Sequence, residues 1–197
     1  MSILKREFYN RPTLDVARDL LGCRLVRVQN GRRMSGWITE TEAYQGEEDL
    51  GCHASAGKTP RTAVMYGAPG HAYVYFTYGM HWLLNAVTSP EGKPAAVLIR
   101  AIQPEEGLDA MAENRPFKAR KSGWTDGPAK LTQALAIDGD LNTIDLCSRD
   151  AGLWIEIGQD IPNEKISQTA RVGLNSVPEP WRSIPWRFVA EGGSLHG

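Results

Sequence analysis

The spacing of apolar residues predicts a short helix and a β-hairpin at the start of the chain. Apolar side chains recur near the helical period over residues 12–21, and Gly22 stands where a left-handed C-cap would end the helix. Residues 23–28 then have the composition of a strand. Asn30-Gly31 is a strong signal for a two-residue hairpin, so residues 33–42 are predicted to return as the second strand.

The middle of the chain predicts a loop followed by three strands. Residues 45–62 show little periodicity and indicate an irregular loop. Residues 71–78 alternate between two strand faces, Gly79 interrupts the pattern, and residues 81–88 are expected to pair back. Residues 95–102 are almost continuously apolar, which is typical of a central strand buried on both faces.

The rest of the chain adds helices and late strands. Residues 105–113 and 128–137 are predicted helices, and residues 153–157 and 186–190 are predicted strands. The chain has no repeats and no low-complexity linker, and 197 residues suit one core. We therefore expect a single α+β domain over residues 1–197, with a curved, mostly antiparallel sheet and flanking helices.

Composition excludes several classes of protein. No apolar run approaches the ~20 residues that span a bilayer, and the N-terminus lacks the apolar core of a signal peptide, so we expect a cytoplasmic protein, nucleoid-associated if bacterial, without membrane contact. Cys23, Cys52 and Cys147 are widely spaced and form no Cys-x-x-Cys pair, which argues against a disulfide framework or a zinc site. Nucleotide-binding loops, the zinc deaminase motif and the serine hydrolase elbow are absent. We expect neither metal nor cofactor.

Charged residues fall into clusters although they almost cancel. A formal net charge of -1 and a pI near 6.4 do not indicate a nucleic-acid-binding domain, since such domains usually carry a basic excess. The acidic clusters are Glu47-Glu48-Asp49 and Glu105-Glu106, and the basic ones are Lys58 with Arg61, Arg115 with Lys118, Arg120 and Lys121, and Arg171 with Arg182 and Arg187. Two interpretations stay open: one basic face, or separate solvated loops, of which the second is slightly favoured.

Two carboxylates stand at the end of the second predicted strand. Glu40 and Glu42 are two residues apart, and side chains at that spacing share one face of a strand. Repulsion between neighbouring carboxylates, together with partial desolvation, is one way in which proteins create a general acid or base. A charged strand edge, with each glutamate paired to an arginine or lysine, is the alternative, and the pair alone favours it.

Aromatic residues are dense in the segment that follows. Such a segment is often ordinary core, because tyrosine and phenylalanine favour strands for packing alone. A buried tyrosine hydroxyl needs a partner, however, so the pattern also indicates a surface where flat apolar faces meet a polar ligand such as a nucleobase. The residues concerned are Tyr44, His53, Tyr66, Tyr73, Tyr75 and Tyr78.

A series of short motifs, in order along almost the whole chain, resembles the alkyladenine (3-methyladenine or methylpurine) DNA glycosylase family. The series is more specific than any of its members. It comprises Glu40-Thr41-Glu42-Ala43-Tyr44, His53, Thr59-Pro60-Arg61, Tyr73-Val74-Tyr75, Tyr78-Gly79-Met80, Asn85, Val97-Leu98-Ile99-Arg100-Ala101, Glu106-Gly107-Leu108, Gly127-Pro128-Ala129-Lys130-Leu131 and Ala170-Arg171-Val172-Gly173.

The resemblance implies a monofunctional enzyme that flips a damaged purine out of duplex DNA and hydrolyses its N-glycosidic bond, without lyase activity. The implied substrates are 3-methyladenine, 7-methylguanine, hypoxanthine and ethenoadenine. By the same resemblance, Glu42 is the general base that activates water, and Arg100 and the main chain near Val172 hold that water. Glu40 is expected to be structural, tied to a backbone group or a basic side chain.

The resemblance also implies how the base is bound. Tyr44, His53 and Tyr75 would sandwich the flipped base, with His53 also bonding to it through its main chain. Asn85 would reject guanine by crowding its exocyclic amine, and Leu98 would form the floor of the pocket.

The partner implied is double-stranded DNA with damaged purines, bound by a monomer. Tyr78 would fill the gap left in the minor groove, and backbone contacts are expected from Tyr73, Arg61, Lys130 and Arg171. Two other functions stay open: a non-catalytic module that binds lesions in the same pocket, and a hydrolase of free nucleosides. An intact Glu42 argues against the first, and an exposed wedge at Tyr78 argues against the second.

Overall fold

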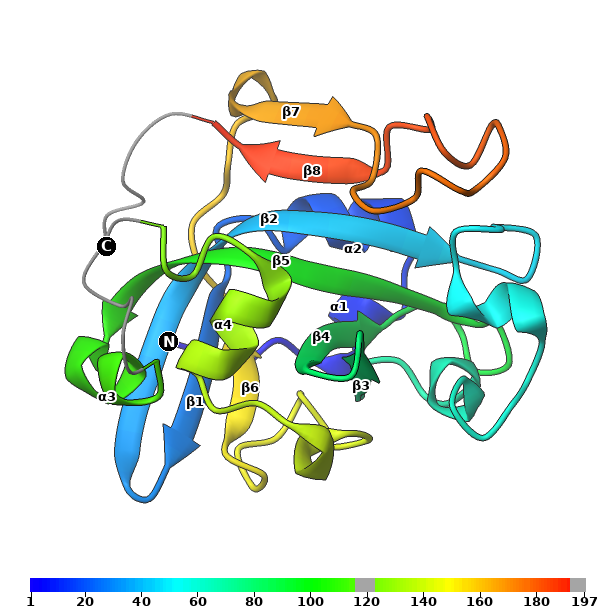
Figure 1. Cartoon of the computed structure of the whole chain (residues 1–197). Coiled ribbons are helices and arrows are strands. Elements are labelled where there is room, and N and C mark those ends of the chain that lie inside the picture. Colours follow the sequence, from blue (N-terminus) through cyan, green and yellow to red (C-terminus); the bar gives the residue numbers. More distant parts are fainter. Residues whose placement is uncertain (116–122, 192–197) are drawn as a thin grey trace.

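The structure, a computed structural model, describes residues 1–115 and 123–191 and is built on one curled antiparallel sheet (Figure 1). The strand order is β3-β4-β5-β2-β1-β6, and β8 pairs with both β2 and β7. The strands are β1 (Arg24–Gln29), β2 (Arg32–Gln45), β3 (Ala72–Thr77), β4 (His81–Val87), β5 (Ala95–Glu106), β6 (Leu153–Glu156), β7 (Ile166–Thr169) and β8 (Arg187–Ala190).

The long strand β2 joins the two parts of this sheet. Its first half pairs with β1 and its second half with β8, while β5 runs along most of its length. The β2–β5 register shifts between Ile38 and Glu40 and again between Glu40 and Thr41. Such irregularities bend a strand and re-aim its side chains. The bend therefore falls at the carboxylate pair.

Short helices cover both faces of the sheet. They are α1 (Arg6–Tyr9), α2 (Thr13–Asp19), α3 (Leu108–Glu113) and α4 (Pro128–Ala134). Figure 1 shows α4 in front of the sheet and α2 behind it. The Thr41 hydroxyl donates to the Ala17 carbonyl at 2.7 Å, which fixes α2 against β2. Within the described ranges, no helix is both long and apolar enough to cross a bilayer.

The fold confirms the predicted class and most of the predicted elements. Gly22 has a φ of 78° just after α2, in the left-handed region expected of it. The helix predicted from residue 105 begins at Leu108 instead, because Glu105 and Glu106 stay in β5 and pair with arginines of β1 and β2. The predicted loop 45–62 contains a single turn of 3₁₀-helix at His53–Ala56.

Candidate active site

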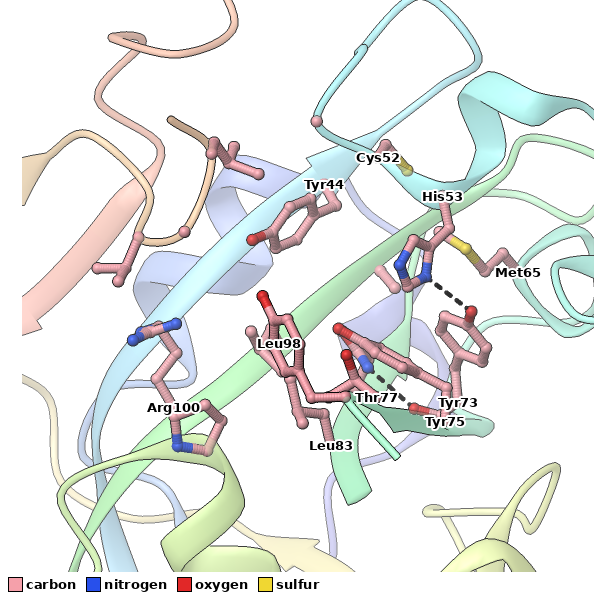
Figure 2. Close-up of a pocket in the computed structure, with 18 residues that line it drawn as sticks. Tyr44, Cys52, His53, Met65, Tyr73, Tyr75, Thr77, Leu83, Leu98 and Arg100 are labelled. Atoms are coloured by element: carbon pink, nitrogen blue, oxygen red, sulfur yellow. Dashed lines mark hydrogen bonds between the residues drawn. The ribbon is translucent and has the colours of Figure 1, made fainter. Parts of the chain in front are cut away.

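A cavity of about 380 Å³ opens where β2, β3, β4 and β5 meet two loops (Figure 2). This volume lies within the usual range of small-molecule sites, ~300–1,000 Å³. Most of the lining is apolar or aromatic. The lining residues are Tyr44, Gly51, Cys52, His53, Met65, Tyr73, Tyr75, Thr77, Tyr78, Leu83, Asn85, Ala96, Leu98, Arg100, Pro128, Val172, Gly173 and Leu174.

Glu42 lies in the wall behind this lining and is fully buried. Its Oε1 accepts the main-chain N–H of Val172 at 2.7 Å. Its Oε2 accepts two hydrogen bonds, one from the Tyr44 hydroxyl at 2.7 Å and one from Nη1 of Arg100 at 3.3 Å. Burying a carboxylate is costly unless it is paired and hydrogen-bonded, and three donors meet that demand. They also hold the carboxylate in one orientation.

Glu40 has the structural partners predicted for it. Its Oε1 accepts two hydrogen bonds, one from Nε of Arg100 at 2.7 Å and one from Nε of Arg187 at 2.6 Å. Arg100 therefore bridges Glu40 and Glu42, which confirms that the two carboxylates lie on one side of β2. Each glutamate is paired to an arginine, as the alternative interpretation predicts, and a role for either carboxylate as a general acid or base stays a prediction.

Aromatic rings form two sides of the cavity. Figure 2 shows Tyr44 on one side and His53 with Tyr75 on another. The His53 and Tyr75 ring centroids are 4.6 Å apart with an edge-on geometry. Burial, and then the neighbouring Glu42, raise the pKa of Tyr44 well above its usual value, so its hydroxyl stays protonated and donates. The cavity thus presents flat, neutral rings to a ligand.

His53 is held neutral by its surroundings. Burial, followed by repulsion from Arg61, lowers its pKa to about 4. Its Nδ1 lies 2.9 Å from the Tyr73 hydroxyl, which fixes the ring plane. An uncharged imidazole suits a stacking role better than it suits proton transfer near neutral pH.

We expect acid to destabilise the protein through His53. The unfolded imidazole takes up a proton near pH 6.5 and the folded one near pH 4. Between these values the unfolded state binds more protons, so stability falls as the pH drops through this window, by roughly 2–3 kcal/mol from this group. The free energy of unfolding, measured in urea at about pH 7 and at about pH 4.5, gives this loss of stability. His53→Gln should lose less stability than wild type over the same interval, and equal losses would contradict the assignment.

Asn85 and Leu98 form the inner end of the cavity. They face each other across the β4–β5 pair. The Asn85 Nδ2 donates to the Tyr73 carbonyl at 3.0 Å, so the amide is fixed in one orientation. A buried, anchored amide is a suitable group for discriminating between polar ligands.

Tyr78 stands at the tip of the β3–β4 hairpin, at the rim of the cavity. It is 83% exposed, and Met80 beside it is 68% exposed. Tyr78 has a φ of 51°, which is uncommon for a non-glycine residue and turns the hairpin sharply. An exposed aromatic side chain on this turn is available to a partner.

Two residues predicted to contact the DNA backbone have buried side chains, which argues against that role for them. Tyr73 is 2% exposed, and its hydroxyl is engaged by His53. Arg171 is 4% exposed, and its guanidinium pairs with Asp49. Neither side chain has a surface to offer a phosphate.

The other two predicted backbone contacts are on the surface. Arg61 is exposed, and its guanidinium lies 5.1 Å from the centroid of the Tyr75 ring. Lys130 is exposed and donates to the Gly123 carbonyl and to Asp126 at the start of α4. Both remain predicted contacts with DNA.

Several of the clustered charges are paired with opposite charges in the described part of the chain. Asp49 is buried against Arg171, while Glu105 and Glu106 pair with arginines of the sheet. Arg187 binds Glu40 and Arg182 binds Glu179. The cluster that begins at Arg115 continues into residues 116–122, which lie outside the described residues. Lys58 and Arg61 are both exposed, as the interpretation of separate solvated loops predicts for that cluster.

Sequence reasoning missed one buried residue beside the site, Asp49. It sits in a run of three acids, and nothing in that run separates a buried aspartate from its exposed neighbours Glu47 and Glu48. The nearest signal is the pair of glycines around it, Gly46 and Gly51, which indicate a tight loop.

The chain is similar to known proteins over most of its length. A sequence model of the family described as methylpurine-DNA glycosylase matches residues 7–194. A protein of Carboxydothermus hydrogenoformans named "Putative 3-methyladenine DNA glycosylase" is 48% identical, over 94% of this chain and 94% of its own. Proteins of the same name from Methanocella arvoryzae and Desulfitobacterium hafniense are 48% and 47% identical, over 95% and 97% of this chain and 92% and 96% of theirs.

Proposed function

Because this chain belongs to the methylpurine-DNA glycosylase family, we propose that it removes damaged purines from duplex DNA by hydrolysing their N-glycosidic bonds. The observation that carries the proposal is the carboxylate of Glu42, fully buried and held by three donors beside an aromatic cavity. Such a site joins a place for a flat base to a group that can accept a proton from water. An abasic site in the DNA is the product.

Glu42 is the general base of the proposed reaction. It takes a proton from water as the water oxygen bonds to C1′ of the sugar, and the C1′–N bond breaks with its electron pair leaving on the base. Arg100 and the loop at Val172 orient the carboxylate and its water. A general base supplies only about 10²–10⁴ in rate, so correct placement of water, sugar and base supplies much of the rest.

Flipping the base requires compensation for lost stacking. Unstacking and unpairing cost a few kcal/mol, and less for a damaged base pair. In the proposal, Tyr78 fills the space vacated in the duplex from the minor-groove side, as apolar wedges do in other DNA-binding proteins. Tyr44, His53 and Tyr75 then stack on the flipped base, each such contact being worth about 1–3 kcal/mol.

The proposed substrates are 3-methyladenine, 7-methylguanine, hypoxanthine and ethenoadenine. A purine that carries a positive charge after alkylation leaves more readily, because it departs as a neutral base. It also stacks well on electron-rich rings through the cation–π effect. Neutral lesions depend more on the fit between the base and the cavity.

The proposed reaction has no lyase step. A lyase step needs an amine that forms a Schiff base with the sugar, and no lysine of the described residues lines the cavity. Lys130 is the lysine of the family-like motif beside Pro128, and its Nζ is 2.5 Å from Asp126 Oδ1. Its proposed role is a contact with phosphate.

Asn85→Ala is expected to let undamaged guanine enter the cavity. The anchored amide of Asn85 leaves no room for the 2-amino group of guanine in the proposed binding mode, and removing it leaves space. Release of guanine from undamaged duplex DNA measures the effect, which should rise about 10-fold or more above wild type.

Leu83→Ala is the matched control, because it also widens the cavity from β4 but keeps the amide. It should leave guanine excluded. If both variants release guanine equally, the discrimination comes from cavity size rather than from the amide, and the role of Asn85 is wrong.

Single-turnover excision from duplexes that contain hypoxanthine or ethenoadenine, and from methylated DNA, tests the proposed function. Alkali-sensitive abasic sites with any of these substrates are expected. Tight lesion binding without abasic sites on any of them would instead support the non-catalytic binding module. Release of bases from free nucleosides but not from duplex DNA would support the nucleoside hydrolase.

A further inference from the structure

Asp49 and Arg171 form a buried ion pair directly behind the cavity wall. The pair is bidentate: Nη1 of Arg171 donates to Oδ2 of Asp49 at 2.6 Å, and Nη2 donates to Oδ1 at 2.8 Å. Both side chains are completely inaccessible. The two residues are 122 positions apart in the chain. They therefore tie the C-terminal loop to the loop that follows β2.

The same two side chains also bond to three separate backbone segments. Asp49 accepts the main-chain N–H of Gly51 at 2.9 Å, in the loop that leads to His53. Arg171 donates to the Ala43 carbonyl at 3.1 Å, inside β2, and to the Trp181 carbonyl at 3.2 Å. The Gly51 loop and β2 carry different walls of the cavity, so the pair fixes the positions of these two walls relative to each other.

Arg171 also supports the aromatic wall from behind. Its guanidinium carbon lies 4.6 Å from the centroid of the Tyr44 ring and 5.1 Å from that of Trp186. A planar guanidinium in contact with two rings restrains their tilt. Tyr44 is the ring that donates to Glu42, so its tilt affects the carboxylate as well as the stacking surface.

The next peptide in the chain connects the pair to Glu42 directly. The N–H of the Arg171–Val172 peptide is the donor to Oε1 of Glu42. The anchored side chain of Arg171 therefore restrains the backbone immediately before this donor. Gly51 packs so closely that a Cβ there would lie 2.8 Å from Nη2 of Arg171, which leaves the guanidinium little freedom.

We propose that Asp49 and Arg171 are a positioning pair for the reaction, which sets Tyr44 and the Val172 N–H relative to Glu42. This inference rests on the proposed function. Stability alone is a poor reason for such a pair, because buried ion pairs are often replaceable by apolar residues without loss. A bidentate, ring-stacked arginine instead specifies one geometry.

Arg171→Lys is the main test. Lysine keeps the charge beside Asp49 but has neither the planar fork nor the stacking surface, so the pair persists while the geometry is lost. We expect the single-turnover excision rate to fall about 10-fold or more, because small displacements of reacting groups are costly. The amide resonance of Val172, which lies downfield while it is bonded to a carboxylate, should move upfield in NMR spectra of the free protein.

The double variant Asp49→Asn with Arg171→Met separates positioning from folding. Each single change leaves one charge buried without a partner and should lower the thermal midpoint. The double variant buries no charge and should recover most of that midpoint, while its excision rate stays about 10-fold or more below wild type.

Arg24→Met is the matched control, since Arg24 is also buried, lies 4.7 Å from the Trp37 ring centroid and pairs with Glu105, away from the cavity. It should lower the midpoint and keep the excision rate. Recovery of both midpoint and rate in the double variant, or a wild-type rate and Val172 resonance in Arg171→Lys, would overturn the proposal.

The NMR readout also separates failure of this inference from failure of the proposed function. It needs no DNA, so it reports on the Val172 donor even if the wild type forms no abasic site. An absent excision activity with the expected upfield shift would reject the function and leave the geometric link between Arg171 and Val172 standing. Normal excision by Arg171→Lys, with the Val172 resonance unshifted, would reject this inference and leave the proposed function standing.

Discussion

Glu42→Gln is expected to lose most of the excision activity while the protein still folds and binds lesion DNA. Glutamine has the shape of glutamate but cannot accept a proton from water at neutral pH. The single-turnover rate should therefore fall by about 10²–10⁴, the usual contribution of a general base. Stacking and wedge contacts are unchanged, so the affinity for a lesion duplex should stay within a few-fold of wild type.

The local hydrogen bonds make this substitution tolerable. Oε1 of Glu42 faces the Val172 N–H, and Oε2 faces the Tyr44 hydroxyl and Arg100. A glutamine can keep its carbonyl toward Val172, and the Tyr44 hydroxyl can turn to accept from its amide. We therefore expect folding to survive at some cost in stability.

Glu40→Gln is the control for Glu42→Gln. Glu40 is the neighbouring carboxylate on the same strand and shares Arg100, but its other partner is Arg187 rather than the cavity residues Tyr44 and Val172 that bond to Glu42. Its variant should retain most of the excision rate. Excision by Glu42→Gln at the wild-type rate, measured on the same hypoxanthine and ethenoadenine duplexes, would remove Glu42 from the proposed mechanism.

Local patterns in the sequence were sufficient for most of the sheet and for the position of the carboxylates. Period-two alternation located β3, the break at Gly79 located the returning strand β4, and an apolar run located β5. The Asn30-Gly31 turn located the β1–β2 hairpin that delivers Glu42 to the cavity wall.

Local patterns could not predict which residues far apart in the sequence pair with each other. Arg171 looks like a surface arginine in the sequence, and only the fold reveals that Asp49 buries it. The short strand β7 was missed because it lies at the margin of the sheet and is half exposed, so its alternation is weak. Glu105 and Glu106 were assigned to a helix because their arginine partners come from other strands.

Arg100→Met is expected to combine loss of activity with loss of stability. Arg100 is the donor that Glu40 and Glu42 share, and its side chain is only 13% exposed. Removing it leaves two adjacent carboxylates, one of which keeps only neutral donors. Breaking a buried ion pair from one side costs about 3–5 kcal/mol, so the free energy of unfolding, measured in urea, should fall by about 3 kcal/mol.

The excision rate of Arg100→Met should fall about 10²-fold, because Glu42 is free to move from the position that activates water. Arg187→Met separates this effect from the loss of a charge near Glu40, since Arg187 binds Glu40 at 2.6 Å and makes no recorded bond to Glu42. The Arg187→Met variant should be less stable than wild type but keep most of its single-turnover excision rate. Equal losses of rate in the two variants would show that the charge around Glu40 controls the reaction, and that the contact between Arg100 and Glu42 does not.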